Sequence, residues 1–173
     1  MPKHLIHVLL CVCFFLSGSV NAQALWGNTN ASMSIGQVQQ VQPSASDTFE
    51  KPEKLDNGAI EKLRITSVEI DGIPYTASFY FLAEKLYQVS LSSGDVDAKT
   101  VVHKFRTLVD ALKSKYGDEI SKKYDSGLLG ITARSTWQSG RTTIRANLFS
   151  FSGSPGLLYI VYNSALSNTA DKL

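Results

Sequence analysis

A cluster of arginine and aromatic residues near the C-terminal end is the part of the sequence best suited to binding chemistry. Arginine and tryptophan are enriched where protein interfaces gain most of their binding energy. Paired strands on either side of the turn at residues 138–140 would gather the arginines into a basic patch beside the tryptophan. We predict a partner-binding surface there, the alternative being a solvated sheet face with scattered arginines. Its residues are Arg134, Trp137, Arg141, Arg145 and Phe149.

Nucleophilic and acid–base catalysis find little support in the sequence. His103 is the one histidine beyond the first ten residues, and it lies opposite the apolar stripe of a predicted helix, where it should face solvent. A Ser-His-Asp arrangement would need a serine from another element beside that exposed face. The chain also lacks the G-x-S-x-G motif that positions a nucleophilic serine in hydrolases. We therefore predict no catalytic residue and no enzymatic activity.

Metal and cofactor sites are not expected either. The carboxylates show no clustering at the spacing of metal ligands, and no phosphate-binding glycine motif is present. Two alternatives to a protein-binding role stay open. A pair of carboxylates could serve an enzyme acting on envelope glycan, although nothing singles out two of them. The protein could also bind a glycan or another small ligand through Trp26, Trp137 and its tyrosines.

The first two dozen residues predict an export signal. Lys3 is followed by an apolar run over residues 5–16, and small residues then offer a cut after Ala22 or after Ala24. The run is shorter than the roughly 20 residues that a membrane-spanning helix needs. We predict a signal peptide over residues 1–22 and a location in the periplasm or outside the cell.

Removing this leader changes the available chemistry, because Cys11 and Cys13 are the only cysteines. A product starting at residue 23 would have no disulfide, thiolate nucleophile or cysteine-ligated metal. The formal net charge of the chain is +2, which gives no general electrostatic reason to bind nucleic acid or an anionic membrane. We predict one domain over residues 23–173, with no nucleic-acid partner and no membrane span.

The first half of that domain reads as a short helix followed by strands. Ser34 and Gln37 have the spacing of a capping box that opens a helix over residues 35–42, and Pro43 ends it. Residues 43–58 are polar and contain two prolines, which predicts a connector without regular structure. Alternation of apolar and polar residues then predicts three strands, over residues 63–70, 75–82 and 86–92, with a hairpin turn at Asp71-Gly72.

The second half repeats this order. A wide apolar stripe predicts a helix over residues 98–116, capped by Asp97 and ended by Gly117. Residues 118–130 read as a polar loop. Three further strands are predicted over residues 131–137, 141–151 and 157–162. The order α-βββ-α-βββ favours the α+β class, as a two-layer sandwich of about six antiparallel strands with the helices on one face.

Two stretches resemble known exported modules. Trp26-Gly27 followed by Met33-Ser34-Ile35-Gly36-Gln37-Val38 is similar to the entry of SmpA/OmlA-type envelope modules and of the repeats in β-lactamase-inhibitor proteins. The helix end Lys115-Tyr116-Gly117 and the apolar strand at residues 157–162 extend this resemblance. It implies an exported α+β domain that binds another protein through an exposed sheet face, without catalysis. The connector at residues 43–58 and the lack of a lipid-attachment cysteine depart from those modules.

The sequence therefore predicts a non-enzymatic, exported protein-binding domain. An inhibitor, an immunity protein or an envelope assembly factor would each fit this description. The expected partner is another envelope or exported protein, and the sequence leaves its identity and the oligomeric state open.

Overall fold

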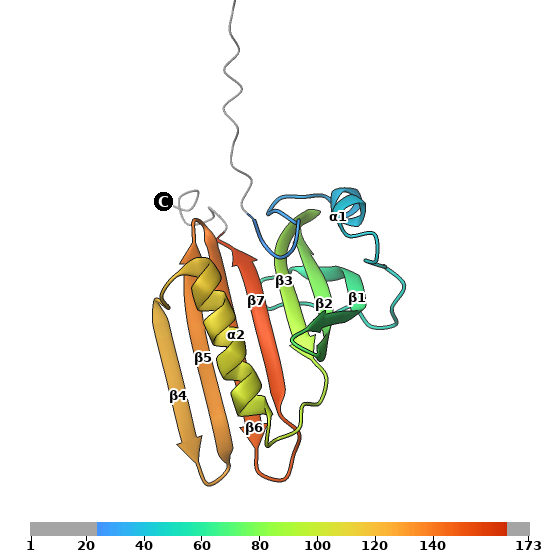
Figure 1. The fold of residues 1–173 in the computed structure, drawn as a ribbon. Helices are drawn as coiled ribbons and strands as arrows, with labels where there is room; N and C mark the ends of the chain where they lie inside the picture. The colour runs from blue at the N-terminus through green and yellow to red at the C-terminus, as the bar shows by residue number, and fades with distance from the viewer. Residues whose placement is uncertain (1–23, 166–173) are drawn as a thin grey trace, which may run out of the picture.

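The computed structural model describes residues 24–165 of the 173-residue chain (Figure 1). The predicted leader over residues 1–22, with both cysteines, lies outside the described residues. Within them, seven strands form one antiparallel sheet on which two helices pack, which confirms the α+β class. Neither of these helices has the length and apolar character needed to cross a bilayer.

The elements follow one another as a helix, three strands, a helix and four strands. The helices are α1 (Ile35–Val41) and α2 (Val101–Tyr116). The strands are β1 (Ile60–Ile70), β2 (Ile73–Leu82), β3 (Lys85–Ser93), β4 (Ser121–Gly127), β5 (Gly130–Ser139), β6 (Thr142–Phe151) and β7 (Leu157–Ser164). In the sheet they lie in the order β1-β2-β3-β7-β6-β5-β4, so that β3 and β7 join the two halves.

The predicted order α-βββ-α-βββ is wrong in its second half, because β4 lies where a polar loop was expected. Its sequence, Ser-Lys-Lys-Tyr-Asp-Ser-Gly, is exposed at every position. An edge strand that buries neither face has no apolar alternation to reveal it. What makes it a strand is its unbroken pairing with β5, from Ser121 opposite Thr136 to Gly127 opposite Gly130.

The helix ends agree with the sequence except at the start of α2. In α1, the Gln37 amide donates to the Ser34 hydroxyl at 3.3 Å and the Ser34 amide donates to the Gln37 side chain at 2.9 Å, which confirms the capping box. The second helix begins at Val101 rather than residue 98. Asp97 accepts from the Lys99 amide at 2.9 Å in a turn that precedes this helix.

Alternation along the strands places the apolar side chains on the face that the helices cover. Figure 1 shows α2 lying across β5, β6 and β7, with α1 near β1, β2 and β3. One core cluster accordingly contains Val38 of α1, Phe105 of α2 and Phe79 of β2. Trp137 lies fully buried in this cluster, and its indole Nε1 donates to the carbonyl oxygen of Gly117 at 3.1 Å.

The connector over residues 43–58 contains no helix or strand, as predicted, but it is tied to β1. Ser46 and Arg64 exchange two backbone hydrogen bonds, of 2.9 and 2.8 Å. The Glu61 amide donates to the carbonyl of Glu53 at 2.8 Å. The connector therefore runs along the outer edge of β1 and closes that side of the sheet.

The burial of Trp137 gives a stability prediction. Replacing Trp137 with alanine should lower the free energy of unfolding by about 3–5 kcal/mol, because a large core side chain and its hydrogen bond are lost together. Denaturant unfolding followed by circular dichroism measures this loss. Leu128→Ala is the control, since Leu128 is 100% exposed and should change stability by less than about 0.5 kcal/mol. Equal losses in the two variants would contradict the core position of Trp137.

Candidate functional site: the open face of the sheet

The face of the sheet turned away from both helices is the candidate site, and we call it the open face. Among residues 24–165, no helix covers it. Cross-strand pairing sorts its side chains into rows. The first row runs Lys123, Arg134, Asn147, Tyr159, Ser92 and Thr76. The second runs Thr136, Arg145, Val161, Ser90, Ser78 and Arg64, and the third Asp125, Thr132, Phe149 and Leu157.

Two adjoining hollows lie on the open face and share Phe149. The larger, of about 610 Å³, is lined by hydroxyl-bearing residues of β2 and β3 and by Phe149, Leu157 and Tyr159. The smaller, of about 320 Å³, is lined by residues of β4, β5 and β6 that include Lys123 and Arg134. Hollows of this size are large enough to take a side chain or a short segment of a ligand.

Arg134 is held in place by hydrogen bonds that cross three strands. Its Nε donates to Oδ1 of Asn147 at 2.7 Å, and Nδ2 of Asn147 donates to the carbonyl oxygen of Tyr159 at 3.2 Å. Asn147 is buried, so its amide is fixed from both sides. Within the described residues, the two terminal nitrogens of Arg134 make no hydrogen bond. They are the groups that can bind a carboxylate through two parallel hydrogen bonds.

The part of the open face formed by β4, β5 and β6 is positively charged. Lys123, Arg134 and Arg145 form no ion pair with another residue in the described range 24–165, and Asp125 is the carboxylate in the same rows. Burial raises the pKa of the nearby Tyr159 hydroxyl, which outweighs the opposite effects of its bond with Ser90 and of Arg145. Tyr159 therefore keeps its proton and can act as a donor.

The structure separates two of the predicted site residues from the other three. Arg134, Arg145 and Phe149 share the open face, as the pairing of β5 with β6 requires. Trp137 does not lie beside them: it points to the opposite, helix-covered face, where it is 0% exposed. Arg141 lies at the β5–β6 turn and donates to the carbonyl of Ala165 at 3.3 Å. A partner bound at the middle of the open face would therefore contact neither the Trp137 indole nor Arg141.

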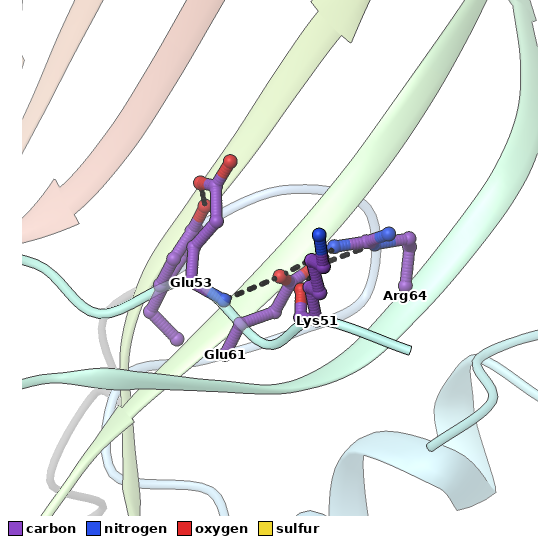
Figure 2. A network of polar contacts seen from close by, with 5 residues as sticks. Lys51, Glu53, Glu61 and Arg64 are labelled. Carbon is purple, nitrogen blue, oxygen red and sulfur yellow. Dashed lines mark hydrogen bonds and ion pairs between the residues drawn. The ribbon is translucent and has the colours of Figure 1, made fainter. Parts of the chain in front are cut away.

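A second polar cluster lies where the connector crosses β1 and β2 (Figure 2). The carboxylate of Glu61 accepts from Nε of Arg64 at 2.7 Å, from Nη2 of Arg64 at 2.6 Å and from the Glu53 amide at 3.2 Å. The Tyr80 hydroxyl donates to the Glu53 side chain at 2.7 Å. Arg64 also lies over the ring of Phe49, 4.4 Å from its centroid. The cluster thus fastens the connector to the sheet.

A β-bulge brings Glu61 and Arg64 of this cluster together. Residues three apart point to opposite faces of a regular strand. In β1 the pairing register shifts between Glu61 and Leu63, so Glu61 and Arg64 both reach the open face. Burial alone would raise the pKa of Glu61, but hydrogen bonds from Arg64, Ser78 and the Glu53 amide hold that pKa below its ordinary value. The Glu61 carboxyl therefore stays ionised.

The groups that could support catalysis are already engaged or exposed. His103 faces solvent on α2, as predicted. Glu53 is the acidic residue that lines the larger hollow, and its Oε2 accepts from the Tyr80 hydroxyl, while both oxygens of Glu61 accept from Arg64. Within the described residues, no group of three histidine, cysteine or acidic side chains is placed to hold a metal ion.

Several open-face residues were not predicted from the sequence. Lys123 was missed because its strand was read as a loop. Leu157 and Tyr159 were assigned to a strand apolar on both faces, and only the uncovered side of β7 distinguishes them from the core. Residues 157–162 show no alternation of polar and apolar side chains, so only the pairing of Tyr159 with Asn147 and of Val161 with Arg145 identifies those on the open face.

Comparisons with protein families, curated proteins and solved structures find no match for this chain. The function therefore has to be inferred from the geometry and charge of the open face.

The depressed pKa of Glu61 predicts a pH dependence of stability. Folding lowers the pKa of Glu61 from an unfolded value of 4.5, so its carboxylate contributes fully to stability at a pH above that value. This contribution is lost as the pH falls through the lower pKa of the folded state. Glu61→Gln should flatten the acid limb of the stability curve, which is the part where the free energy of unfolding falls as the pH decreases. It should also cost about 3 kcal/mol at neutral pH, because Arg64 loses its buried partner. Urea unfolding between pH 7 and pH 3 measures both effects.

Glu69→Gln is the matched control, because Glu69 lies exposed on the same strand and makes no ion pair within residues 24–165. It should leave both the neutral stability and the acid limb unchanged. An acid limb that is the same in Glu61→Gln as in the unaltered chain would show that Glu61 is not the group responsible.

Proposed function

We propose that this protein is an exported binding protein, without catalytic activity of its own, whose open face takes an acidic, extended segment of another envelope or exported protein. The observation that supports this is the set of groups on one uncovered face. Lys123, Arg134 and Arg145 have no ion partner among residues 24–165, and Phe149 and Tyr159 lie beside them. An inhibitor, an immunity protein or an assembly factor would each act through such contact.

The arrangement fits an acidic segment better than a neutral one. Arg134 is already oriented by Asn147, so little side-chain entropy is lost when its terminal nitrogens bind a carboxylate. Phe149 and Leu157 offer apolar surface between the two hollows, where an apolar side chain of the partner can be desolvated. Binding is favoured over catalysis because Glu53 and Glu61 make the hydrogen bonds that hold the connector against β1 and β2.

A glycan ligand is the second candidate. The hydroxyl-lined larger hollow, with Tyr159 at its wall, favours a polar ligand of that kind. The tryptophans cannot supply the stacking surface for it. Trp137 is buried under α2, and Trp26 packs against Phe79 with ring centroids 6.1 Å apart.

Replacing Arg134 and Arg145 together with glutamate should weaken binding of an acidic peptide roughly tenfold or more, because the attraction becomes repulsion. The probe is a synthetic peptide of alternating aspartate and phenylalanine, titrated into the isotope-labelled protein and followed by NMR. We expect shifts at Phe149, Leu157 and Tyr159. The matched control replaces Arg106 and Lys115, on the helix side, with glutamate and should bind like the unaltered protein.

Equal loss of binding in both double variants would show that net charge alone drives the interaction, against a site on the open face. Shifts confined to α2 would also contradict it. Chitin-type oligosaccharides are titrated in parallel. Saturable binding of these sugars that is unaffected by the Arg134 and Arg145 replacements would favour the glycan candidate instead.

The proposed export implies a defined new N-terminus. The carbonyl of Ala24 accepts from the Thr142 hydroxyl at 2.8 Å, and Ala24 bridges Asn30. A cut after Ala22 keeps both contacts, whereas a cut after Ala24 removes them. We therefore expect mass spectrometry of the product made in a bacterial host to find a chain starting at Gln23 in the periplasmic fraction. An uncut chain retained in the cytoplasm would contradict the proposed location.

A further inference from the structure

The two edges of the sheet differ in how their backbone groups are used. At one edge, β1 carries two register shifts and is paired by the connector at Ser46 and Lys54. At the other edge, β4 pairs with β5 without any irregularity, and no described residue pairs with its outer side. Figure 1 shows β4 at the free margin of the sheet. A straight, unpaired edge is a template for adding another strand.

The side chains of β4 are self-complementary in one antiparallel register. If two copies of the strand pair about Tyr124, Lys123 of each copy lies opposite Asp125 of the other. Oppositely charged residues facing each other across two strands stabilise the pair, and like charges destabilise it. Ser121 then lies opposite Gly127, so all seven residues of β4 find a partner.

Other registers lose this match. A two-fold axis perpendicular to the sheet keeps each face on its own side, so the register can move only in steps that preserve side-chain alternation. The next step in one direction places Lys123 opposite Lys123, and the next step in the other places Asp125 opposite Asp125. Charge therefore selects the pairing centred on Tyr124.

Tyr124 itself, on the helix-covered face of β4, favours the same pairing register. Tyr124 is 58% exposed and borders a groove of about 330 Å³ between α2 and the sheet, which Val102, Phe105 and Val109 also line. In the pairing about Tyr124, the two tyrosine rings come directly opposite each other. Aromatic cross-strand pairs add to the stability of a sheet.

We propose that the partner of β4 is a second copy of this chain, in a symmetric dimer that joins the two sheets edge to edge. The charge complementarity of Lys123 and Asp125 about Tyr124 is the observation that identifies the occupant. The dimer places both open faces on the same side. Two seven-residue strands make a small interface, so we expect a dissociation constant of roughly 10 µM or weaker.

Disulfide trapping tests the register. Paired strands hold opposite Cα atoms about 4.5–5.5 Å apart, which suits a disulfide. In the full chain with Cys11→Ser and Cys13→Ser, Tyr124→Cys should form a covalent dimer under mild oxidation. Leu128→Cys is the matched control. It is fully exposed but lies far from its own copy in this register, so it should cross-link at least about tenfold more slowly.

A charge exchange tests the contacts themselves by sedimentation equilibrium at protein concentrations up to about 1 mM. Lys123→Asp should raise the dissociation constant about tenfold or more, and adding Asp125→Lys should restore it to within about twofold. Lys122→Asp is the control, because Lys122 lies on the other face opposite Ser126. A protein that stays monomeric throughout this range, or a double variant that does not recover, would overturn the proposal.

Discussion

Side-chain alternation in the central strands is the constraint on which the rest of the structure depends. Along most of β2 and β6, every second residue is apolar and buried, and the residues between them are mostly polar. The apolar stripe of α2 can therefore pack on one face only, where it meets Trp137. The opposite face keeps hydroxyls, amides and arginines. Helix packing and an accessible polar surface are thus two results of one sequence pattern.

The edges of the sheet add a second asymmetry. The connector closes the β1 edge, where the Glu61 carboxylate accepts from the Glu53 amide and Arg64 donates to the carbonyl of Lys51. The β4 edge has no such cover among the described residues. One face and one edge are therefore accessible, and Lys123 of β4 lies on both. Binding on the open face and pairing at β4 would share this lysine, so the two interactions would influence each other.

The sequence predicted the elements that bury apolar side chains and missed the one that does not. The capping box at Ser34, the turn at Asp71-Gly72 and the end of α2 at Gly117 are confirmed, since each depends on local chemistry. Strand β4 and the inward direction of Trp137 depend on pairing and on which face a helix covers, which local patterns do not contain. The resemblance to SmpA/OmlA-type modules stays a prediction, because no comparison tests it.

The bulge in β1 indicates where the length of this chain can change. Lys62 is the extra residue of the bulge, so deleting it would make Glu61 and Leu63 adjacent and leave the carboxylate and the leucine on their present faces. Deleting one residue from β6, which pairs on both sides without a register shift, would instead turn part of its side chains to the wrong face. An insertion at residues 128–129 would meet only solvent. Tolerance to insertions and deletions should therefore be lowest in the regular central strands and highest at the β4–β5 hairpin tip.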